Sequence, residues 1–189
     1  MAKPKILIVT DDSGESFEIL YAVHRFAEAG CQPVIAASKR KVLHAVLHDF
    51  DPDWNTYVEK PGYRIQAHLA LRQVRPAQYA AVVLIGGRAP EFLRHDAHLI
   101  RIVQVMERAG RGIFAICHGV QILAAAGLMS GRTVTCYRNV RSEVIAAGAR
   151  WVDRQSVVDR NWVTAQTWES HADFYRDIFR SLGRPQPQL

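Results

Sequence analysis

The sequence predicts an α/β fold with a mainly parallel sheet, and two observations support that prediction. Short apolar runs of strand length alternate along the chain with longer segments whose apolar residues recur every three to four positions. Gly30 and Gly110 stand directly after two of the longer segments, where glycine often ends a helix. With 189 residues, of which 49% are hydrophobic and 22% charged, the chain is expected to form a single domain, 1–189, with a sizeable core.

The predicted strands are short and rich in β-branched residues, a composition that suits strands buried on both faces. They are KILIVT (5–10), PVIAAS (33–38), AAVVLIGG (80–87) and GIFAIC (112–117). A hairpin is predicted over 155–165, with its turn at residues 159–161. His44 and His48 have the spacing of a helical metal site, but their segment is predicted to be a strand and no third ligand is evident, so no metal is expected.

Three amphipathic helices are predicted from the spacing of apolar residues. The first lies within 15–30, and its buried face is expected to hold Phe17, Leu20, Val23 or His24, and Ala27. The second lies within 96–110, and its buried face is expected to hold Leu99, Ile102, Val103 and Met106. The third spans about 170–183, and the tail at 184–189 is expected to be frayed.

Residues 49–64 differ from the rest because they combine two prolines and four aromatic residues with no sustained period. We predict a long ordered loop there. Such loops are often functional, and surface packing around Trp54 and Tyr57 is an equally good interpretation.

The composition excludes several classes of protein. The three cysteines are widely spaced and form no CxxC pair, which argues against a disulfide framework or a structural zinc site and favours a reducing compartment. No apolar run approaches the roughly 20 residues that cross a bilayer, so we expect a cytoplasmic protein with no membrane partner. The net charge of +6 comes from scattered basic residues, and we expect no nucleic-acid partner.

Cys117 is the residue with the strongest chemical signal. A strand ending at Ile116 and a helix beginning near Gly119 would put the thiol in a tight turn, as in a nucleophile elbow. The free N–H groups of the helix start are expected to lower the pKa of Cys117 below the ordinary value of about 8.5. We expect Gly119 to allow the sharp turn and to leave space beside the sulfur, and the N–H groups of Gly87 and His118 to form an oxyanion hole. Cys31 and Cys136 are interpreted as small buried hydrophobic residues.

These motifs resemble the ThiJ/PfpI superfamily over nearly the whole chain. The resemblance rests on GGRAPEFL (86–93), AICHGVQILAAAGLMSGR (115–132) and RNWVTAQ (160–166), and extends to the segment that begins HDFDPDW. The superfamily includes the human Parkinson-associated protein, bacterial stress proteins named as intracellular proteases, and plant glyoxalase III enzymes. It implies a flavodoxin-like three-layer sandwich of the class I glutamine amidotransferase-like group.

The resemblance also implies a set of site residues. The family places a glutamate from the first strand-to-helix connection beside the cysteine, and we assign Glu15 to that place, with Glu18 one helical turn further as the competing candidate. A carboxyl close to a thiolate is expected to stay partly protonated and to shuttle protons. In the PfpI branch a glutamate from a neighbouring subunit orients the histidine after the cysteine. Glu91 would orient His118 in this way, so the site would be complete only in a homo-oligomer.

The substrate pocket is less well defined by the resemblance. Trp168 and His171 lie in a region that lines the pocket of similar enzymes, although His171 alternatively caps the last helix. Arg138 stands where the family often has a more compact residue, so the family does not define the shape of this pocket.

Three functions are compatible with these residues. The first is cofactor-independent chemistry on a reactive carbonyl, as in glyoxalase III and deglycase members, in which Cys117 attacks an aldehyde while Glu15 and His118 move protons. The second is hydrolysis of a peptide substrate by the same residues. The third is a stress-induced redox-sensing thiol or holdase chaperone, because a reactive thiolate is also a target of oxidation. Amidotransferase activity is the least expected, since it needs a histidine and a glutamate closely spaced near the end of the chain.

Overall fold

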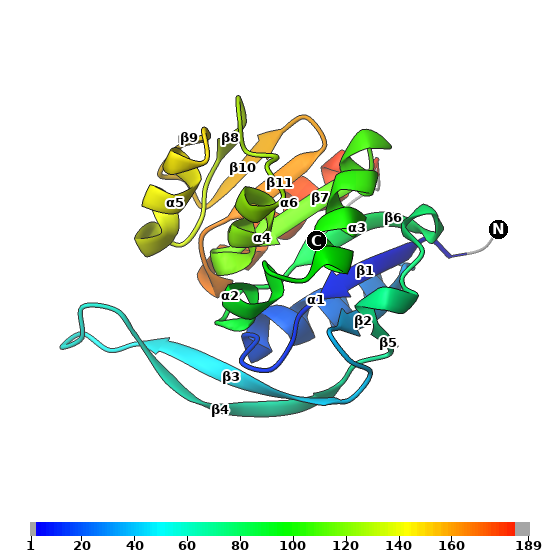
Figure 1. The fold of residues 1–189 in the computed structure, drawn as a ribbon. Helices are drawn as coiled ribbons and strands as arrows, with labels where there is room; N and C mark the ends of the chain where they lie inside the picture. The colour runs from blue at the N-terminus through cyan, green and yellow to red at the C-terminus, as the bar shows by residue number, and fades with distance from the viewer. Residues whose placement is uncertain (1–2, 184–189) are drawn as a thin grey trace.

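The computed structural model describes residues 3–183 and contains a central sheet of seven strands. The strand order is β10-β11-β7-β6-β1-β2-β5 (Figure 1). All neighbours in the sheet are parallel except β10 and β11, which form the predicted hairpin. The strands are β1 Lys5–Val9, β2 Gln32–Ala37, β5 Leu69–Ala70, β6 Tyr79–Leu84, β7 Gly112–Ile116, β10 Ser156–Asp159 and β11 Trp162–Ala165.

Helices cover both faces of this sheet, which gives the expected three layers (Figure 1). Helices α1 and α6 contact each other on one face, while α3, α4 and α2 pack on the other. The helices are α1 Ser16–Glu28, α2 Ala89–Leu93, α3 Ala97–Arg108, α4 Val120–Ala125, α5 Arg141–Ala146 and α6 His171–Ser181. Short 3₁₀ turns occur at Leu71–Gln73, Pro76–Gln78, Cys117–Gly119, Arg138–Val140 and Trp168–Ser170. The α/β prediction is confirmed, and the tail predicted to fray lies outside the described residues.

The buried face of α1 differs from the prediction. Ile19, Ala22 and Phe26 are fully buried, whereas Phe17 is 48% exposed. The helix is therefore rotated from the expected orientation, which brings Glu18 to the face that packs on the sheet. The predicted buried face of α3 is confirmed.

The segment predicted as a long loop, 49–64, forms most of an antiparallel hairpin. Strands β3 (Val42–Phe50) and β4 (Tyr57–Gln66) pair along their length, and only residues 51–56 connect them. The hairpin extends beneath the α/β core (Figure 1). It is attached to the connection before α1 because Val46 N–H donates to Gly14 O at 2.9 Å and Ser13 N–H donates to His44 O at 2.8 Å. A small second sheet pairs β8 (Thr133–Val134) with β9 (Arg150–Trp151).

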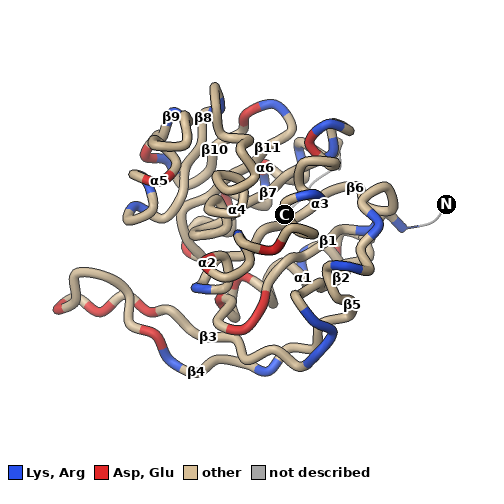
Figure 2. The backbone as a smooth tube through the Cα atoms, viewed as in Figure 1, with Lys and Arg blue, Asp and Glu red and all other residues tan. Residues whose placement is uncertain are grey.

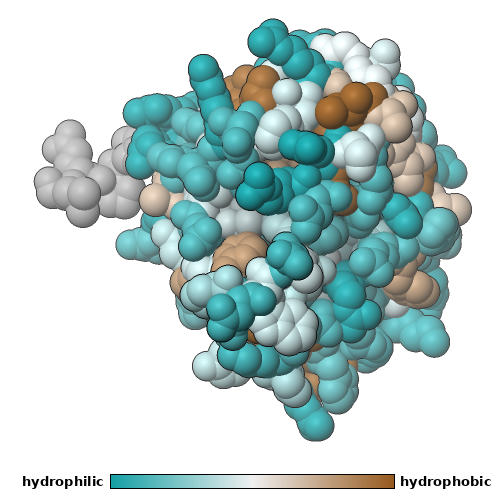
Figure 3. Space-filling view, turned by 90° about the vertical axis from the view of Figure 1, so that its left-hand side faces the viewer, coloured by the Kyte–Doolittle hydropathy of each residue, from teal (hydrophilic) through white to brown (hydrophobic). Residues whose placement is uncertain are grey.

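Charged residues are spread over the surface, with acidic residues along the tip of the β3–β4 hairpin (Figure 2). The face that carries this tip is mainly hydrophilic, with separate apolar patches and a hollow near its middle (Figure 3). Among the described residues, no helix combines the length and the apolar character that crossing a membrane requires.

Candidate active site

Cys117 occupies a strained turn at the carboxyl end of the central strand β7. Its φ angle is +58°, in the left-handed region that costs a residue with a side chain about 1–3 kcal/mol. The thiol is 5% exposed. Gly119 has a different role from the one expected, since a Cβ there would lie 2.2 Å from Leu84 O. Gly119 therefore lets the start of α4 approach β6, and the positive φ falls on the cysteine itself.

Glu18, and not Glu15, is the carboxyl beside the sulfur. Its carboxyl interacts directly with Cys117, and its Oε2 accepts the N–H of Gly86 at 2.7 Å. A Cβ added to Gly86 would lie 2.8 Å from Glu18 Oε2 and 3.1 Å from Cys117 Sγ, so both atoms border the same small space. The choice between the two glutamates made from the sequence is therefore wrong, because rotation of α1 turns Glu18 inward.

Glu15 caps α1 and attaches the hairpin instead. Its carboxylate accepts the N–H of Glu18 at 2.6 Å and also the backbone N–H groups of Phe17 and His48. His48 belongs to β3, so this one side chain links the helix start to the hairpin. Glu15 is only 1% exposed, and burial raises its pKa to about 7 despite these hydrogen bonds.

Burial also raises the pKa of Glu18 and of the Cys117 thiol. For each group the nearby acidic groups add to the effect, while backbone N–H groups act against it. The expected low pKa of Cys117 is thus not what this environment produces, since loss of water outweighs the donors at the helix start. Two neighbouring acids of this kind titrate together, and the pair retains a proton near neutral pH. A Cys117 thiolate would exist beside a protonated Glu18.

Backbone donors surround the sulfur as the sequence predicted. The N–H groups of Gly87 and His118 both hydrogen-bond to Cys117. Gly87 has φ +74°, and a Cβ there would lie 2.3 Å from Ser13 O. Glycine is therefore required for its N–H to reach the thiol while the chain passes so close to the loop before α1.

His118 faces the sulfur although the two residues are adjacent in sequence. Its Nδ1 lies 3.2 Å from Cys117 Sγ, and burial lowers its pKa to about 4. The imidazole is therefore neutral at pH 7 and available to accept a proton. Its ring lies edge-on to Tyr57 at 5.9 Å between centroids and is tilted against Tyr137 at 5.2 Å.

A buried histidine that was not assigned to the site supports Tyr57. The ring of His48 stacks on Tyr57 at 3.9 Å, and its Nε2 hydrogen-bonds to Glu59 at 3.0 Å. Arg88 holds Glu59 in turn through two hydrogen bonds, at 2.8 and 2.6 Å, and lowers the pKa of that carboxyl to about 2. Only the antiparallel register of β3 and β4 brings His48 opposite Glu59, and the loop prediction concealed that register.

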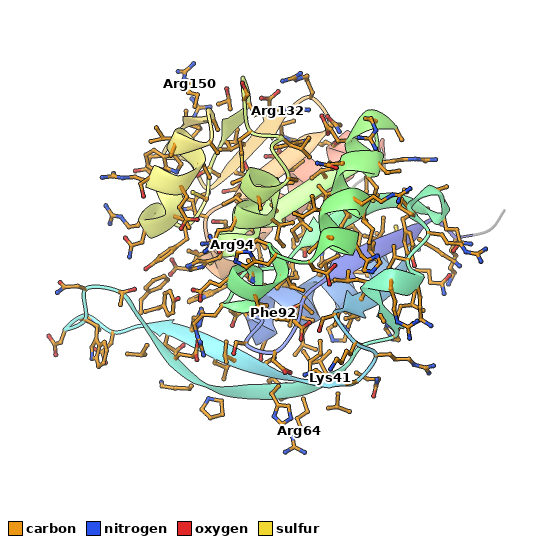
Figure 4. All side chains as sticks on the ribbon, viewed as in Figure 1. Lys41, Arg64, Phe92, Arg94, Arg132 and Arg150 are labelled. Atoms are coloured by element: carbon orange, nitrogen blue, oxygen red, sulfur yellow. The ribbon has the colours of Figure 1, made fainter. Side chains whose placement is uncertain are left out.

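Glu91 lies on the short helix α2, where its side chain is exposed in the single chain. Burial raises the pKa of Tyr57 to about 12, and Cys117 and Glu91 add to this effect, so Glu91 lies close to that phenol. Phe92, the next residue, is 63% exposed, while Arg94 points towards α5 and pairs with Glu143 at 3.1 Å (Figure 4). Glu91 and Phe92 thus leave one side of α2 available for another subunit.

Trp168 and His171 do not line the cavity that borders Tyr137. Trp168 donates from Nε1 to His48 O at 3.0 Å. His171 is 5% exposed and stacks on Tyr21 at 4.4 Å, and neither ring nitrogen has a hydrogen-bond partner among the residues that the structure describes. That cavity is lined instead by their neighbours Thr167 and Glu169. Both rings contact the aromatic cluster between α1 and α6, and this packing accounts for their absence from the lining of that cavity.

No group of three or more potential metal ligands is present between residues 3 and 183. The chemistry that this arrangement supports is nucleophilic attack by a thiolate, with a neutral imidazole and a carboxyl beside it and two backbone N–H groups as donors.

Comparisons with known proteins identify the family of this chain and several of its relatives. A sequence model described as the DJ-1/PfpI family matches residues 4–181. Deglycase PfpI of Pyrococcus furiosus is 36% identical over 162 residues, which cover 86% of this chain and 89% of that protein. Protein/nucleic acid deglycase 2 of Escherichia coli is 35% identical over 181 residues, which cover 95% of this chain and 98% of that protein.

Solved structures show the same fold. A two-domain protein of Anabaena variabilis, with DJ-1/ThiJ/PfpI-like and ferritin-like domains, has a TM-score of 0.85 at 25% identity. The match covers 96% of this chain and 49% of that one. DJ-1 of Schizosaccharomyces pombe has a TM-score of 0.79 at 15% identity and covers 94% of this chain and 91% of that one.

Proposed function

Because this chain belongs to the DJ-1/PfpI family, we propose that it is a cysteine-dependent, cofactor-independent enzyme that acts on reactive carbonyls, as a glyoxalase III or deglycase. Relatives 35% and 36% identical over most of this chain carry the name deglycase. The observation that carries the proposal is the convergence on one sulfur of the Glu18 carboxyl, the His118 ring and the N–H groups of Gly87 and His118.

Methylglyoxal serves as the simplest substrate. The Cys117 thiolate attacks the aldehyde carbon, a C–S bond forms, and the oxygen becomes an oxyanion that the two backbone N–H groups stabilise. Glu18 lies where it would protonate that oxygen, which is the role that we assigned to Glu15 from the sequence. The product of this step is a hemithioacetal.

His118 then moves the remaining proton. Its neutral Nδ1 removes the hydrogen of the former aldehyde carbon, giving an enediol, and the proton returns to the neighbouring carbon. The resulting lactoyl thioester is hydrolysed by one water, which releases lactate and restores the thiol. The aldehyde carbon is oxidised while the ketone carbon is reduced, so no external oxidant or reductant enters the balance. On a glycated amine, the free amine leaves as a second product.

Glu91 extends the proposal to an assembly. We expect a homo-oligomer, at least a dimer, in which Glu91 of one subunit hydrogen-bonds to His118 of another and fixes its ring. This residue is exposed, and in the part of the chain that the structure describes no side chain forms a hydrogen bond or ion pair with it. Without that partner His118 depends on the contacts of Tyr57 and Tyr137 for its orientation.

The test measures lactate formed from methylglyoxal by the purified, reduced protein without glutathione, metal or nicotinamide. We expect turnover by the wild type and none by Cys117→Ala. Cys136→Ala is the matched control because Cys136 is also a buried free thiol. Equal residual rates in wild type and Cys117→Ala would show scavenging by other groups and would favour the peptidase or redox-sensor alternatives.

A further inference from the structure

Tyr57, the first residue of β4, brings a side chain of the hairpin to the thiol site. Its ring lies edge-on to that of His118 at 5.9 Å between centroids and is tilted against Tyr137 at 5.6 Å. The same His118 ring places its Nδ1 3.2 Å from Cys117 Sγ. Burial raises the pKa of Tyr57 to about 12, and Cys117 makes the largest electrostatic addition to this effect. The phenol of Tyr57 therefore lies near the sulfur as well as near the imidazole.

The hydroxyl of Tyr57 is a hydrogen-bond donor that no protein group uses. Between residues 3 and 183 it forms no hydrogen bond, whereas the hydroxyl of Tyr137 beside it is paired with Thr56 and with Asn139, each at 3.0 Å. A half-buried tyrosine usually finds a partner for its hydroxyl. With a pKa of about 12 the phenol keeps its proton at neutral pH, so it can donate to an oxygen of a bound ligand.

The position of the Tyr57 ring is fixed from its other side. His48 stacks on it at 3.9 Å, and the Nε2 of His48 hydrogen-bonds to Glu59 at 3.0 Å. Arg88 holds Glu59 through two further hydrogen bonds, at 2.8 and 2.6 Å. A donor that is held in place before the ligand arrives loses little freedom on binding, so it can recognise an oxygen at one particular position.

The substrate of the proposed reaction has two oxygens, and the groups around the sulfur account for one of them. The N–H groups of Gly87 and His118 and the carboxyl of Glu18 serve the oxygen of the aldehyde that the thiolate attacks. When His118 removes the hydrogen of that carbon, negative charge develops on the oxygen of the neighbouring carbonyl. A fixed donor aimed at this second oxygen would stabilise that charge.

We propose that the Tyr57 hydroxyl donates a hydrogen bond to the second carbonyl oxygen of the substrate, so that an α-dicarbonyl binds and reacts better than an aldehyde with a single oxygen. This inference rests on the proposed function and adds a catalytic residue to it. Tyr57 keeps its proton throughout, so it stabilises charge on this oxygen and takes no part in the proton balance of the reaction.

The first measurement needs no turnover. Methylglyoxal and propanal both form a hemithioacetal with a thiol, but only methylglyoxal has a second carbonyl oxygen. Each aldehyde, in large excess, is tested for its ability to protect Cys117 from alkylation by iodoacetamide, with the alkylated residue located by mass spectrometry. We expect Tyr57→Phe to weaken protection by methylglyoxal about tenfold, as for the loss of one hydrogen bond, and to leave protection by propanal unchanged. Tyr63→Phe, which removes an exposed hydroxyl from the same hairpin, is the matched control and should behave as the wild type.

Turnover of methylglyoxal is measured in parallel, and kcat of Tyr57→Phe should fall by about 10²-fold because the second oxygen carries charge during the reaction. The assignment of Tyr57 is wrong if methylglyoxal protects Tyr57→Phe as well as it protects the wild type, or if it protects neither. It is also wrong if protection by both aldehydes falls equally, since Tyr57 would then only shape the surroundings of the thiol. Absence of turnover in the wild type would refute the proposed function, while the comparison of the two aldehydes would still decide whether Tyr57 contacts the second oxygen.

Discussion

His171 gives the fold a dependence on acid that a single substitution should remove. Its ring is 5% exposed and lies among aromatic side chains, and within residues 3–183 neither ring nitrogen has a hydrogen-bond partner. Burial lowers its pKa from 6.5 to about 4. Protonation would place an uncompensated cation in this cluster, so the folded state holds the ring neutral over a pH range in which the unfolded chain binds a proton.

The direction and the size of the change in stability follow from the pKa of His171 in the unfolded chain, 6.5, and in the folded protein, about 4. Between pH 6.5 and 4 the unfolded state binds more protons, so the free energy of unfolding falls as the pH falls. The full difference of 2.5 pH units corresponds to about 3.4 kcal/mol, of which roughly 2 kcal/mol is lost by pH 5. His171→Phe keeps an aromatic ring that does not titrate, so its stability relative to wild type should rise by about that amount between pH 7.5 and pH 5.

Urea unfolding followed by fluorescence at several pH values measures this difference. The comparison uses only how the difference in the free energy of unfolding between His171→Phe and wild type changes with pH. The effect of packing a phenylalanine at this position is the same at each pH and therefore cancels. His98→Gln removes an exposed histidine on α3 and should leave the pH dependence as it is in the wild type. A constant difference between His171→Phe and wild type from pH 7.5 to 5 would refute the reasoning.

Two further substitutions test the thiol site. Gly86→Ala would put a Cβ 2.5 Å from the Cys117 Cβ, so we expect at least about a 100-fold loss of methylglyoxal turnover, with folding checked by circular dichroism. Glu91→Ala should lower turnover by about 10²-fold, and mixing it with Cys117→Ala should restore part of the activity, because a mixed assembly pairs an intact Cys117 with an intact Glu91. No recovery after subunit exchange would argue against a residue donated across the interface.

The sequence predicted the parts of the fold that depend on local pattern. Each predicted strand of the central sheet is confirmed, because apolar β-branched runs bounded by loops have few alternatives in an α/β chain. Cys117 was found for a similar reason, since the strand, turn and helix around it are contiguous in sequence. The segment of His44 and His48 was predicted to be a strand, and β3 confirms this. Strand β4 and its pairing with β3 were missed because β4 is largely exposed and rich in polar residues, and pairing is a long-range property that a local period does not reveal.

Glu15 was assigned to the site from the resemblance of this segment to the family's first helix, whereas the orientation of α1 in the structure places Glu18 there. Phe17 suggested a buried face, but the structure leaves that ring on the aromatic cluster with Trp168 and His171, and buries Ile19, Ala22 and Phe26 instead. Apolar residues cover more than half of this helix, so two faces satisfied the same spacing. Only the packing of α1 in the structure distinguishes Glu18, which faces the sulfur, from Glu15, which caps the helix.

The two glutamates differ in a way that kinetics can separate from stability. Glu18→Gln removes the proton-donating carboxyl beside the sulfur, so turnover should fall by about 10²- to 10⁴-fold while the stability changes little or increases, because a buried acid with a raised pKa becomes a neutral amide. Glu15→Gln replaces a carboxylate that caps α1 and accepts the N–H of His48, so its main effect should be on the attachment of the hairpin, with turnover within about tenfold of wild type. Hydrogen exchange at β3 and β4 reports that attachment. If Glu15→Gln abolished turnover with normal protection of the hairpin, while Glu18→Gln remained active, the assignment made from the sequence would be right and the packing argument would be wrong.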